Sequence, residues 1–265
     1  MTSWKRPDSV PHPKVWRRAV GRKPVDGKVP SFVIQDVPED REEELVDFME
    51  EHFMHNEPLC KCLNINSDSA SLKDLRGLWE EMLAQRIAVV AFLEDDGPRP
   101  RIAGANMLGV VTRAEKSVKH EYEGVVMKSV EKLLDDLDSL ADPFEKYGVE
   151  EYIAAMGLSV AKEFQGQGLG KELLKARFDV GRAVGVKLTV TAFTAIESQV
   201  LATREGFEEL ARIDYKDYKV EAAAQEDDDQ LEETRLSAAP QGVAASGRQE
   251  AGGWQGAVLR HPGRS

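Results

Sequence analysis

The pattern of hydrophobic and polar positions is strong only between residues 31 and 219. Short runs rich in β-branched and apolar residues predict strands, and these runs occupy residues 32–37, 87–93, 102–111, 151–160, 186–193 and 207–218. Amphipathic stretches, with apolar residues three and four positions apart, predict helices, and these stretches occupy residues 38–54, 72–85, 125–140, 168–184 and 195–205.

The order of these elements predicts an α/β fold with one domain over residues 31–219. Its first half contains a hairpin across Asp95-Asp96-Gly97-Pro98, which favours antiparallel pairing. In its second half strands alternate with helices, which favours a parallel β-α-β arrangement. We therefore expect a mixed central sheet, antiparallel in its N-terminal half and parallel in its C-terminal part, with helices on both faces.

Both ends of the chain lack this pattern. Residues 1–30 are rich in Pro, Lys and Arg, so we expect a disordered basic arm. A mitochondrial presequence is the alternative, but the prolines oppose the amphipathic helix that it needs. Residues 220–265 contain an acidic run at 226–229 and then become rich in Gly, Ala and Arg. We expect this tail to be disordered as well.

Composition and charge exclude several classes of function. No apolar run approaches the ~20 residues that span a bilayer, and the first residues do not resemble a secretory signal. The net charge of −12 argues against non-specific binding to nucleic acid. Cys60 and Cys62 are separated by one residue, a poor spacing for zinc or a disulfide. We expect a cytoplasmic protein with reduced thiols and no metal, nucleic-acid or membrane partner, and we favour a monomer.

A glycine-rich turn joins the strand predicted at 151–160 to the helix predicted at 168–184. The turn consists of Gln165, Gly166, Gln167, Gly168, Leu169 and Gly170. Backbone N–H groups and the positive end of the helix dipole make such a turn an anion site, and glycine lets an oxygen approach the main chain. The Lys171-Glu172 that follows excludes a P-loop, and the glycine spacing is not that of a dinucleotide fingerprint. A tight turn without a ligand is the alternative.

This turn resembles the Gln/Arg-x-x-Gly-x-Gly/Ala motif of the GNAT superfamily of N-acetyltransferases. Gln165, Gly168 and Gly170 would be its signature positions. The order of predicted elements over residues 31–219 is also similar to that superfamily's. The resemblance implies the acetyltransferase fold, with acetyl-CoA as co-substrate and its pyrophosphate bound at the turn.

A narrower resemblance is to the arthropod arylalkylamine (dopamine-type) N-acetyltransferases. Short segments match in the same order along the chain: Glu57-Pro58-Leu59, Leu158-Ser159-Val160, Ser198 before Gly206-Phe207, and Asp217-Tyr218-Lys219. The chain resembles a divergent member of that family. The resemblance implies that the backbones of Leu158, Ser159 and Val160 pair with the pantetheine arm of acetyl-CoA, as a β-strand would.

Glu57 is the candidate general base. Acetylation needs a neutral amine, and an aliphatic ammonium with a pKa near ~10 is less than ~1 % neutral at pH 7, so a carboxylate must accept a proton. Pro58 disfavours helical geometry for Glu57 and places it where the chain leaves a helix. The alternative is a solvated carboxylate at a helix end. His52 lies on the apolar stripe and is expected in the core, whereas His55 is a candidate neighbour of Glu57.

Two hydroxyl groups are candidates for protonating the leaving thiolate. Many superfamily members place a Tyr four residues after the position of Ser198, but this chain has Ala202 there. The arthropod family implies hydroxyls at Thr194 and Ser198 instead. A thiol pKa near ~8.5 also lets the thiolate depart unaided. The alternative role for Ser198 is an N-cap or packing residue of the following helix.

The C-terminal pattern departs from that of the relatives, which end in a strand after an Ala-Ala-Pro-like segment. Ala238-Ala239-Pro240 is present, but residues 242–246 are poor strand formers. We expect the last strand to be missing. The competing expectation is that residues 238–246 still add an edge strand.

These inferences favour an acetyl-CoA-dependent N-acetyltransferase that acts by direct transfer on small primary amines. The resemblance implies arylalkylamines such as dopamine, serotonin, octopamine or tyramine. One alternative is an acetyltransferase for polyamines or protein amino groups. The other is a catalytically weak acetyl-CoA-binding regulatory protein.

Overall fold

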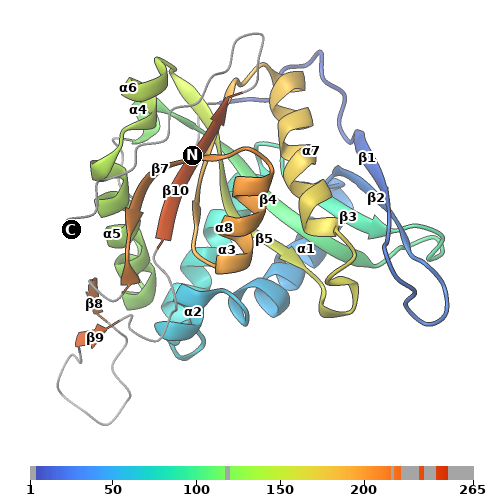
Figure 1. The fold of residues 1–265 in the computed structure, drawn as a ribbon, viewed down its shortest axis with the longest axis horizontal. Helices are drawn as coiled ribbons and strands as arrows, with labels where there is room; N and C mark the ends of the chain where they lie inside the picture. Colours follow the sequence, from blue (N-terminus) through green and yellow to red (C-terminus); the bar gives the residue numbers. More distant parts are fainter. Residues whose placement is uncertain (1–3, 117–119, 216–217, 222–232, 236–242, 250–265) are drawn as a thin grey trace.

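An eight-stranded sheet with the order β1-β2-β3-β4-β5-β6-β10-β7 runs through the centre of the molecule (Figure 1). The computed structural model describes residues 4–116, 120–215, 218–221, 233–235 and 243–249. The strands of this sheet are β1 Val15–Val20, β2 Ser31–Asp36, β3 Val89–Leu93, β4 Ile102–Thr112, β5 Glu151–Val160, β6 Leu188–Phe193, β7 Glu208–Ile213 and β10 Val243–Gln249. Neighbouring strands are antiparallel, except for the parallel pair β5 and β6. The expected mixed α/β sheet is therefore confirmed.

A second, two-stranded sheet pairs β8 with β9. These strands are Lys219–Glu221 and Glu233–Arg235. Short turns of other helix types also occur: the 3₁₀ turns Glu39–Arg41, Ile65–Ser67 and Lys162–Phe164, and the π-helix Glu50–Met54.

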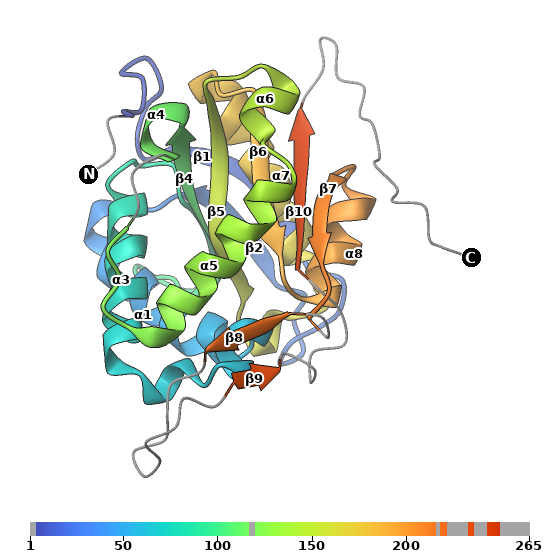
Figure 2. The ribbon, with the colours of Figure 1, turned by 90° about the vertical axis from the view of Figure 1, so that its left-hand side faces the viewer.

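Helices cover both faces of the sheet (Figures 1 and 2). They are α1 Glu42–Met49, α2 Pro58–Cys62, α3 Ser69–Leu83, α4 Arg113–Lys116, α5 Val125–Leu140, α6 Pro143–Tyr147, α7 Leu169–Val184 and α8 Ile196–Arg204. α7 and α8 lie on one face, and α1 and α3 lie on the other.

The central strand β4 shows why its sequence lacks a polar face. A Cβ built on Gly104 would lie 3.0 Å from Leu173 of α7, and one built on Gly109 would lie 3.2 Å from Met82 of α3. Both faces of β4 are thus covered by helices, and its residues 102–110 are all buried. A strand buried on both sides has a continuous apolar run instead of an alternating one.

We expected a disordered N-terminal arm, and this prediction is wrong for residues 4–30, which the structure describes. β1 pairs with β2 along its length. The carboxylate of Asp36, which is fully buried, accepts hydrogen bonds from Trp16 Nε1 at 2.6 Å and from Arg6 Nη2 at 2.8 Å. Basic and proline-rich composition suggested disorder, but a buried carboxylate in the neighbouring strand supplies the partner for these residues. The domain therefore begins well before residue 31.

The expectation of a missing C-terminal strand is also wrong. β10 lies between β6 and β7 and pairs with both, so it is not an edge strand either. Two ladders satisfy the backbone groups on both of its sides, which outweighs the low β-propensity of its Gly and Ala residues. The domain therefore extends past residue 219. The remainder of the expected disordered tail, residues 222–232, 236–242 and 250–265, lies outside the described residues.

Candidate active site

The glycine-rich turn at the start of α7 has the backbone geometry of an anion cradle. Gly166 and Gly168 have φ angles of +76° and +86°, a region that side chains with a Cβ avoid. Gly168 is the N-cap of α7 and provides no side-chain cap. The N–H groups in the first turn of this 16-residue helix are therefore left for an anion, at the positive end of the helix dipole. The turn fits the pyrophosphate expected there.

The two glutamines of this turn have their side chains engaged by the protein. Gln165 Nε2 donates to the Val160 carbonyl at 3.2 Å. Gln167 is buried, and its side chain hydrogen-bonds the backbone of Arg22 and Lys23 in the β1–β2 connection. Leu169 is buried and Gly170 half-buried at the start of α7.

The strands β5 and β6 separate next to this turn. They pair in register at Ile153 and Thr189. Farther along, Leu158, Ser159 and Val160 pair on one side with β4, and in the described chain no strand pairs with their other side. β6 is paired with β10 instead. The separation leaves backbone hydrogen-bonding groups of β5 for an extended ligand, as expected for a pantetheine arm.

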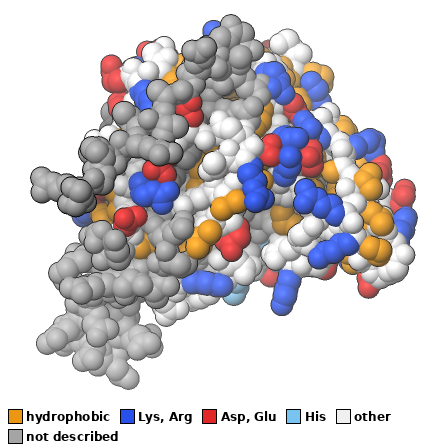
Figure 3. All heavy atoms as spheres, in the orientation of Figure 1, with side chains coloured by type: hydrophobic (Ala, Val, Ile, Leu, Met, Phe, Trp, Pro, Cys, Tyr) orange, Lys and Arg blue, Asp and Glu red, His pale blue; other side chains and the backbone are white. Residues whose placement is uncertain are grey.

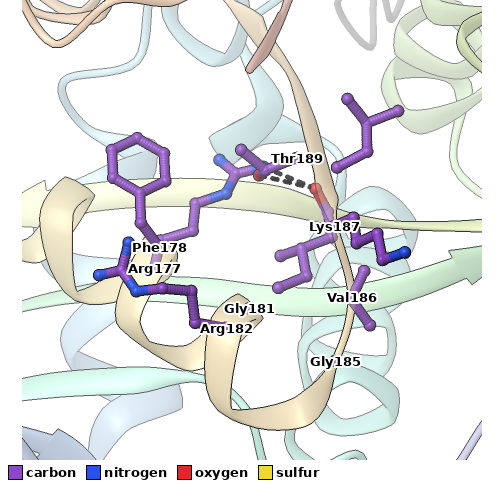
Figure 4. A pocket seen from close by; sticks show the side chains of 10 residues that line it. Arg177, Phe178, Gly181, Arg182, Gly185, Val186, Lys187 and Thr189 are labelled. Carbon is purple, nitrogen blue, oxygen red and sulfur yellow. Dashed lines mark hydrogen bonds between the residues drawn. The ribbon is translucent and has the colours of Figure 1, made fainter. Parts of the chain in front are cut away.

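Arg177 of α7 occupies the point where the two strands part (Figure 4). Its Nη2 donates to the carbonyls of Ile153 at 2.8 Å and Val190 at 2.9 Å, and Thr189 Oγ1 also donates to Ile153. Burial lowers the pKa of the Arg177 guanidinium below its ordinary value. Its hydrogen bonds satisfy carbonyls that lose their ladder partners at the split. A hollow of about 250 Å³ beside it lies toward Gly185, at the opposite end of α7 from the glycine turn.

A bulge in β5 brings the segment that precedes Glu57 against this strand. Gly157 has a φ of +113°, and the pairing of β4 with β5 shifts register here. A Cβ on Gly157 would lie 2.7 Å from Met49 Cε and 3.1 Å from Phe53. The end of α1 and the π-helix after it therefore pack directly on the bulge. Glu57 follows one helical turn later, with its backbone N–H donating to the Phe53 carbonyl at 2.9 Å.

Glu57 is a buried N-cap residue and not a solvated helix end. Its backbone is extended, with φ −71° and ψ 127°, and it caps α2, as the following Pro58 predicts. Oε2 accepts a hydrogen bond from Cys60 N at 2.6 Å. Oε1 is buried and has no hydrogen-bond partner among the described residues. Burial, and then the charge of Glu57, raise the pKa of the Cys60 thiol well above its ordinary value. Oε1 is thus enclosed by the protein, and the Cys60 thiol lies against the same carboxylate.

Tyr215 is hydrogen-bonded to the end of β6 and lies within electrostatic reach of Glu57. Its hydroxyl donates to the Thr194 carbonyl at 3.3 Å, and the side chain is 1 % exposed. Burial, and then the charge of Glu57, raise the pKa of the Tyr215 phenol. The sequence placed Tyr215 in a strand reaching residue 218, whereas β7 ends at Ile213. No local signal marks this residue, because its partners come from two distant segments.

The two candidate hydroxyls lie at the other side of the separation. Thr194 directly follows β6, and Ser198 lies in the first turn of α8; both are half-buried. Ser198 Oγ donates to the Ala195 carbonyl at 2.7 Å. Ala195 is the N-cap of α8, so the alternative of Ser198 as the N-cap is wrong. A packing role and a proton-donor role both remain for its hydroxyl.

The two histidines differ in environment. The His52 ring packs on Phe48, with ring centroids 4.5 Å apart, but it is half-buried and lies outside the buried core, so the core position expected for it is wrong. His55 is exposed, and its Nδ1 lies 3.3 Å from the Glu50 carbonyl. His55 is thus engaged at the end of the π-helix.

The surface over α7 is rich in cations, although the chain carries a net charge of −12. Figure 3 shows Lys and Arg side chains gathered on the face where α7 lies. Such a face suits a phosphate-bearing ligand. Within the described ranges, no helix is long and apolar enough to cross a membrane, and no group of three or more His, Cys, Asp or Glu side chains has a metal-binding arrangement.

Comparison with known proteins agrees with this geometry. The model of the acetyltransferase (GNAT) family matches residues 138–207, which contain the glycine turn and α7. No curated protein has a matching sequence.

Several solved structures share the fold. A putative arylalkylamine N-acetyltransferase 7 from the mosquito Aedes aegypti is 29 % identical, with a TM-score of 0.81 over 93 % of this chain and 99 % of that one. Arylalkylamine N-acetyltransferase 2 of the same mosquito is 20 % identical, with a TM-score of 0.67 over 82 % and 98 %. A polyamine N-acetyltransferase of Drosophila melanogaster is 19 % identical, with a TM-score of 0.60 over 83 % and 100 %. Residues 138–207 thus match the acetyltransferase (GNAT) family, and the chain as a whole resembles the arthropod arylalkylamine N-acetyltransferases, which supports an acyltransferase.

Proposed function

We propose that this protein transfers the acetyl group of acetyl-CoA to a small primary amine, with Glu57 as general base and arylalkylamines as acceptors. The observation that carries this proposal is the buried Glu57 carboxylate, whose Oε1 has no hydrogen-bond partner among the described residues. Glu57 is one helical turn beyond Phe53, which packs on the Gly157 bulge of β5. A buried carboxylate with a free oxygen attracts an ammonium and accepts its proton.

The reaction would begin when Glu57 accepts a proton from the ammonium, directly or through water. The nitrogen lone pair then forms a bond to the thioester carbonyl carbon, and the carbon–sulfur bond breaks with its electron pair on sulfur. The nitrogen loses a second proton, and the thiolate takes up one proton. Ser198 and Thr194 are the proposed hydroxyls on the thiolate side. Both substrates are bound together, so no covalent enzyme intermediate forms.

An arylalkylamine acceptor is supported by the likeness of the chain to the putative arylalkylamine N-acetyltransferase 7 of Aedes aegypti, at 29 % identity and a TM-score of 0.81. An amine with a cationic end fits the buried Glu57 carboxylate.

Turnover of an amine panel by the full chain tests this proposal. Dopamine, serotonin, octopamine and tyramine should be acetylated with kcat/KM at least ~10-fold above agmatine, spermidine and a peptide N-terminus. Preference for agmatine or spermidine would contradict the acceptor assignment. Acetyl-CoA binding without turnover of any amine would contradict the enzymatic proposal and support an acetyl-CoA-binding regulatory protein.

A further inference from the structure

The connection between β1 and β2 brings two cations to the glycine turn. A Cβ on Gly168 would lie 2.9 Å from Arg22 Nε and 3.0 Å from Arg22 Nη2, and a Cβ on Gly166 would lie 3.2 Å from Lys23 Nζ. Arg22 and Lys23 are exposed, and in the described part of the chain neither has a carboxylate within ion-pair distance. A hollow of about 280 Å³ between β1 and the start of α7 is lined in part by Arg22, Gly168 and Leu169.

The position of these cations is held by a buried side chain. Gln167, 3 % exposed, accepts hydrogen bonds from Arg22 N at 2.8 Å and Lys23 N at 3.1 Å, and its Nε2 donates to Lys23 O at 3.0 Å. β1 is also joined to α7 directly, because Arg17 pairs with Glu172 at 3.0 Å and Asp179 at 2.7 Å. The connection is therefore attached to the turn and to the helix that follows it.

The charges in this arrangement are unfavourable without a ligand. Arg22 and Lys23 face the N-terminal end of α7, where the helix dipole is already positive and the glycine turn has no side-chain cap. Glu172 lies in the first turn of α7, but its carboxylate is paired with Arg17 and Lys175. Cations are destabilising at that position, and anions are stabilising. An anion bound between the turn and the two side chains would remove the repulsion and accept hydrogen bonds from both sides. The arrangement thus favours an oxyanion with more than one negative charge.

We propose that Arg22 and Lys23 form the second half of the phosphate site and bind the pyrophosphate of acetyl-CoA opposite the backbone N–H groups of the glycine turn. This inference rests on the proposed function, because it assigns residues to the binding of that co-substrate. Charge-assisted hydrogen bonds from an Arg fork and a Lys to phosphate oxygens would strengthen a site otherwise made of main chain.

Calorimetric titration of the full chain with acetyl-CoA and with dephospho-CoA, which keeps the pyrophosphate but lacks the 3′-phosphate, tests this proposal. The double variant R22A/K23A should bind both ligands about 10- to 100-fold more weakly, and its affinity should depend less on salt than that of the wild type. The single variant R22K should lose less affinity for both ligands than R22A/K23A. The matched control is K28A, because Lys28 lies in the same connection with its side chain 77 % exposed, and it should leave both affinities unchanged.

Thermal unfolding without ligand separates binding from a structural role. Removing two cations from the positive end of a helix should leave the Tm of R22A/K23A unchanged or raise it by about 1–3 °C, whereas a structural role predicts a fall. Unchanged affinity for both ligands would overturn the proposal, as would a loss confined to acetyl-CoA, which would assign the cations to the 3′-phosphate. Wild-type protein that binds neither ligand would overturn the proposed function as well.

Discussion

The phosphate turn and the acceptor side of this site are built in different ways. The turn comprises six consecutive residues, and its binding groups are main-chain N–H groups exposed by glycine geometry. The proposed acceptor side comprises Glu57, Thr194 and Tyr215, which come from three separate segments, and the Tyr215 hydroxyl donates to the Thr194 backbone carbonyl. A site made of backbone is readable from a short motif, while a site made of packed side chains depends on the whole fold. The two should therefore respond differently to substitution.

The largest expected effect is at the phosphate turn. We expect Gly168→Asp to abolish acetyl-CoA binding, because a carboxylate there would repel the pyrophosphate and take the place of the anion beside Arg22. Calorimetry measures the loss. Gly185→Asp is a matched control, since Gly185 has a similar φ of +83° at the other end of α7 with nothing within 4 Å of its Cβ position. An equal loss in both variants would mean that backbone strain, and not the anion site, explains the effect.

Substitution of Glu57 should separate the acceptor side from the phosphate turn. Glu57→Gln should lower kcat/KM for amines by about 10²- to 10⁴-fold, the usual contribution of a general base, while the Kd for acetyl-CoA stays near that of the wild type. The loss should shrink as pH rises toward the amine pKa, because neutral amine then becomes available from solution.

The control for this experiment is Glu51→Gln. Glu51 lies in the π-helix just before Glu57, with its side chain 77 % exposed, and its replacement should leave kcat/KM unchanged. A loss at Glu57→Gln that is the same at every pH would assign Glu57 to structure or amine positioning.

Truncation tests how far the acceptor side depends on the C-terminal strand. Removal of residues 222–265 deletes β10, which separates β6 from β7. We expect the Tm to fall by about 10 °C or more, since the backbone groups of two neighbouring strands lose their partners. Removal of residues 250–265 keeps β10 and should leave the Tm within about 2 °C of the full chain. Equal Tm values for both truncations would contradict the placement of β10.

Tyr215→Phe should have a moderate effect confined to the acceptor side. It removes the hydroxyl that donates to Thr194 at the end of β6, and a net loss of about 0.5–1.5 kcal/mol in stability is expected for such a hydrogen bond. The kcat/KM for amines should fall about 3- to 10-fold at constant acetyl-CoA affinity. Denaturant unfolding and steady-state kinetics measure the two effects. A change in acetyl-CoA affinity with an unchanged kcat/KM for amines would instead assign Tyr215 to the acetyl-CoA side of the site.

The smallest expected effect is at Ser198. Its hydroxyl already donates to the Ala195 carbonyl, and a CoA thiolate can depart unaided at neutral pH. We expect Ser198→Ala to lower kcat by less than about 5-fold. A loss above 100-fold, with normal acetyl-CoA affinity, would instead establish Ser198 as a required proton donor.

Elements with long regular patterns were predictable from the sequence. The helix at α5 and the strand at β5 were expected with the observed bounds, because their periodicity over 16 and 10 residues outweighs local exceptions. α2, at five residues, was too short to show a period. β1 was missed because its six residues, Val-Trp-Arg-Arg-Ala-Val, do not alternate between apolar and polar positions, and its pairing depends on Asp36 of another strand.

The residues of the candidate site also fall into two groups: those that a local sequence pattern marks, and those that only contacts between distant segments bring together. The sequence alone determined the glycine turn, because φ angles above zero and a helix N-terminus are local properties of Gly166 to Gly170. It also marked Glu57 through the Pro58 that follows it. Only the tertiary structure decided that β10 inserts between β6 and β7, that Tyr215 lies within reach of both Glu57 and Thr194, and that Arg22 and Lys23 face the turn. Each of these depends on contacts between distant segments, whose free energy comes from burial and strand pairing and leaves no periodic signal in the chain.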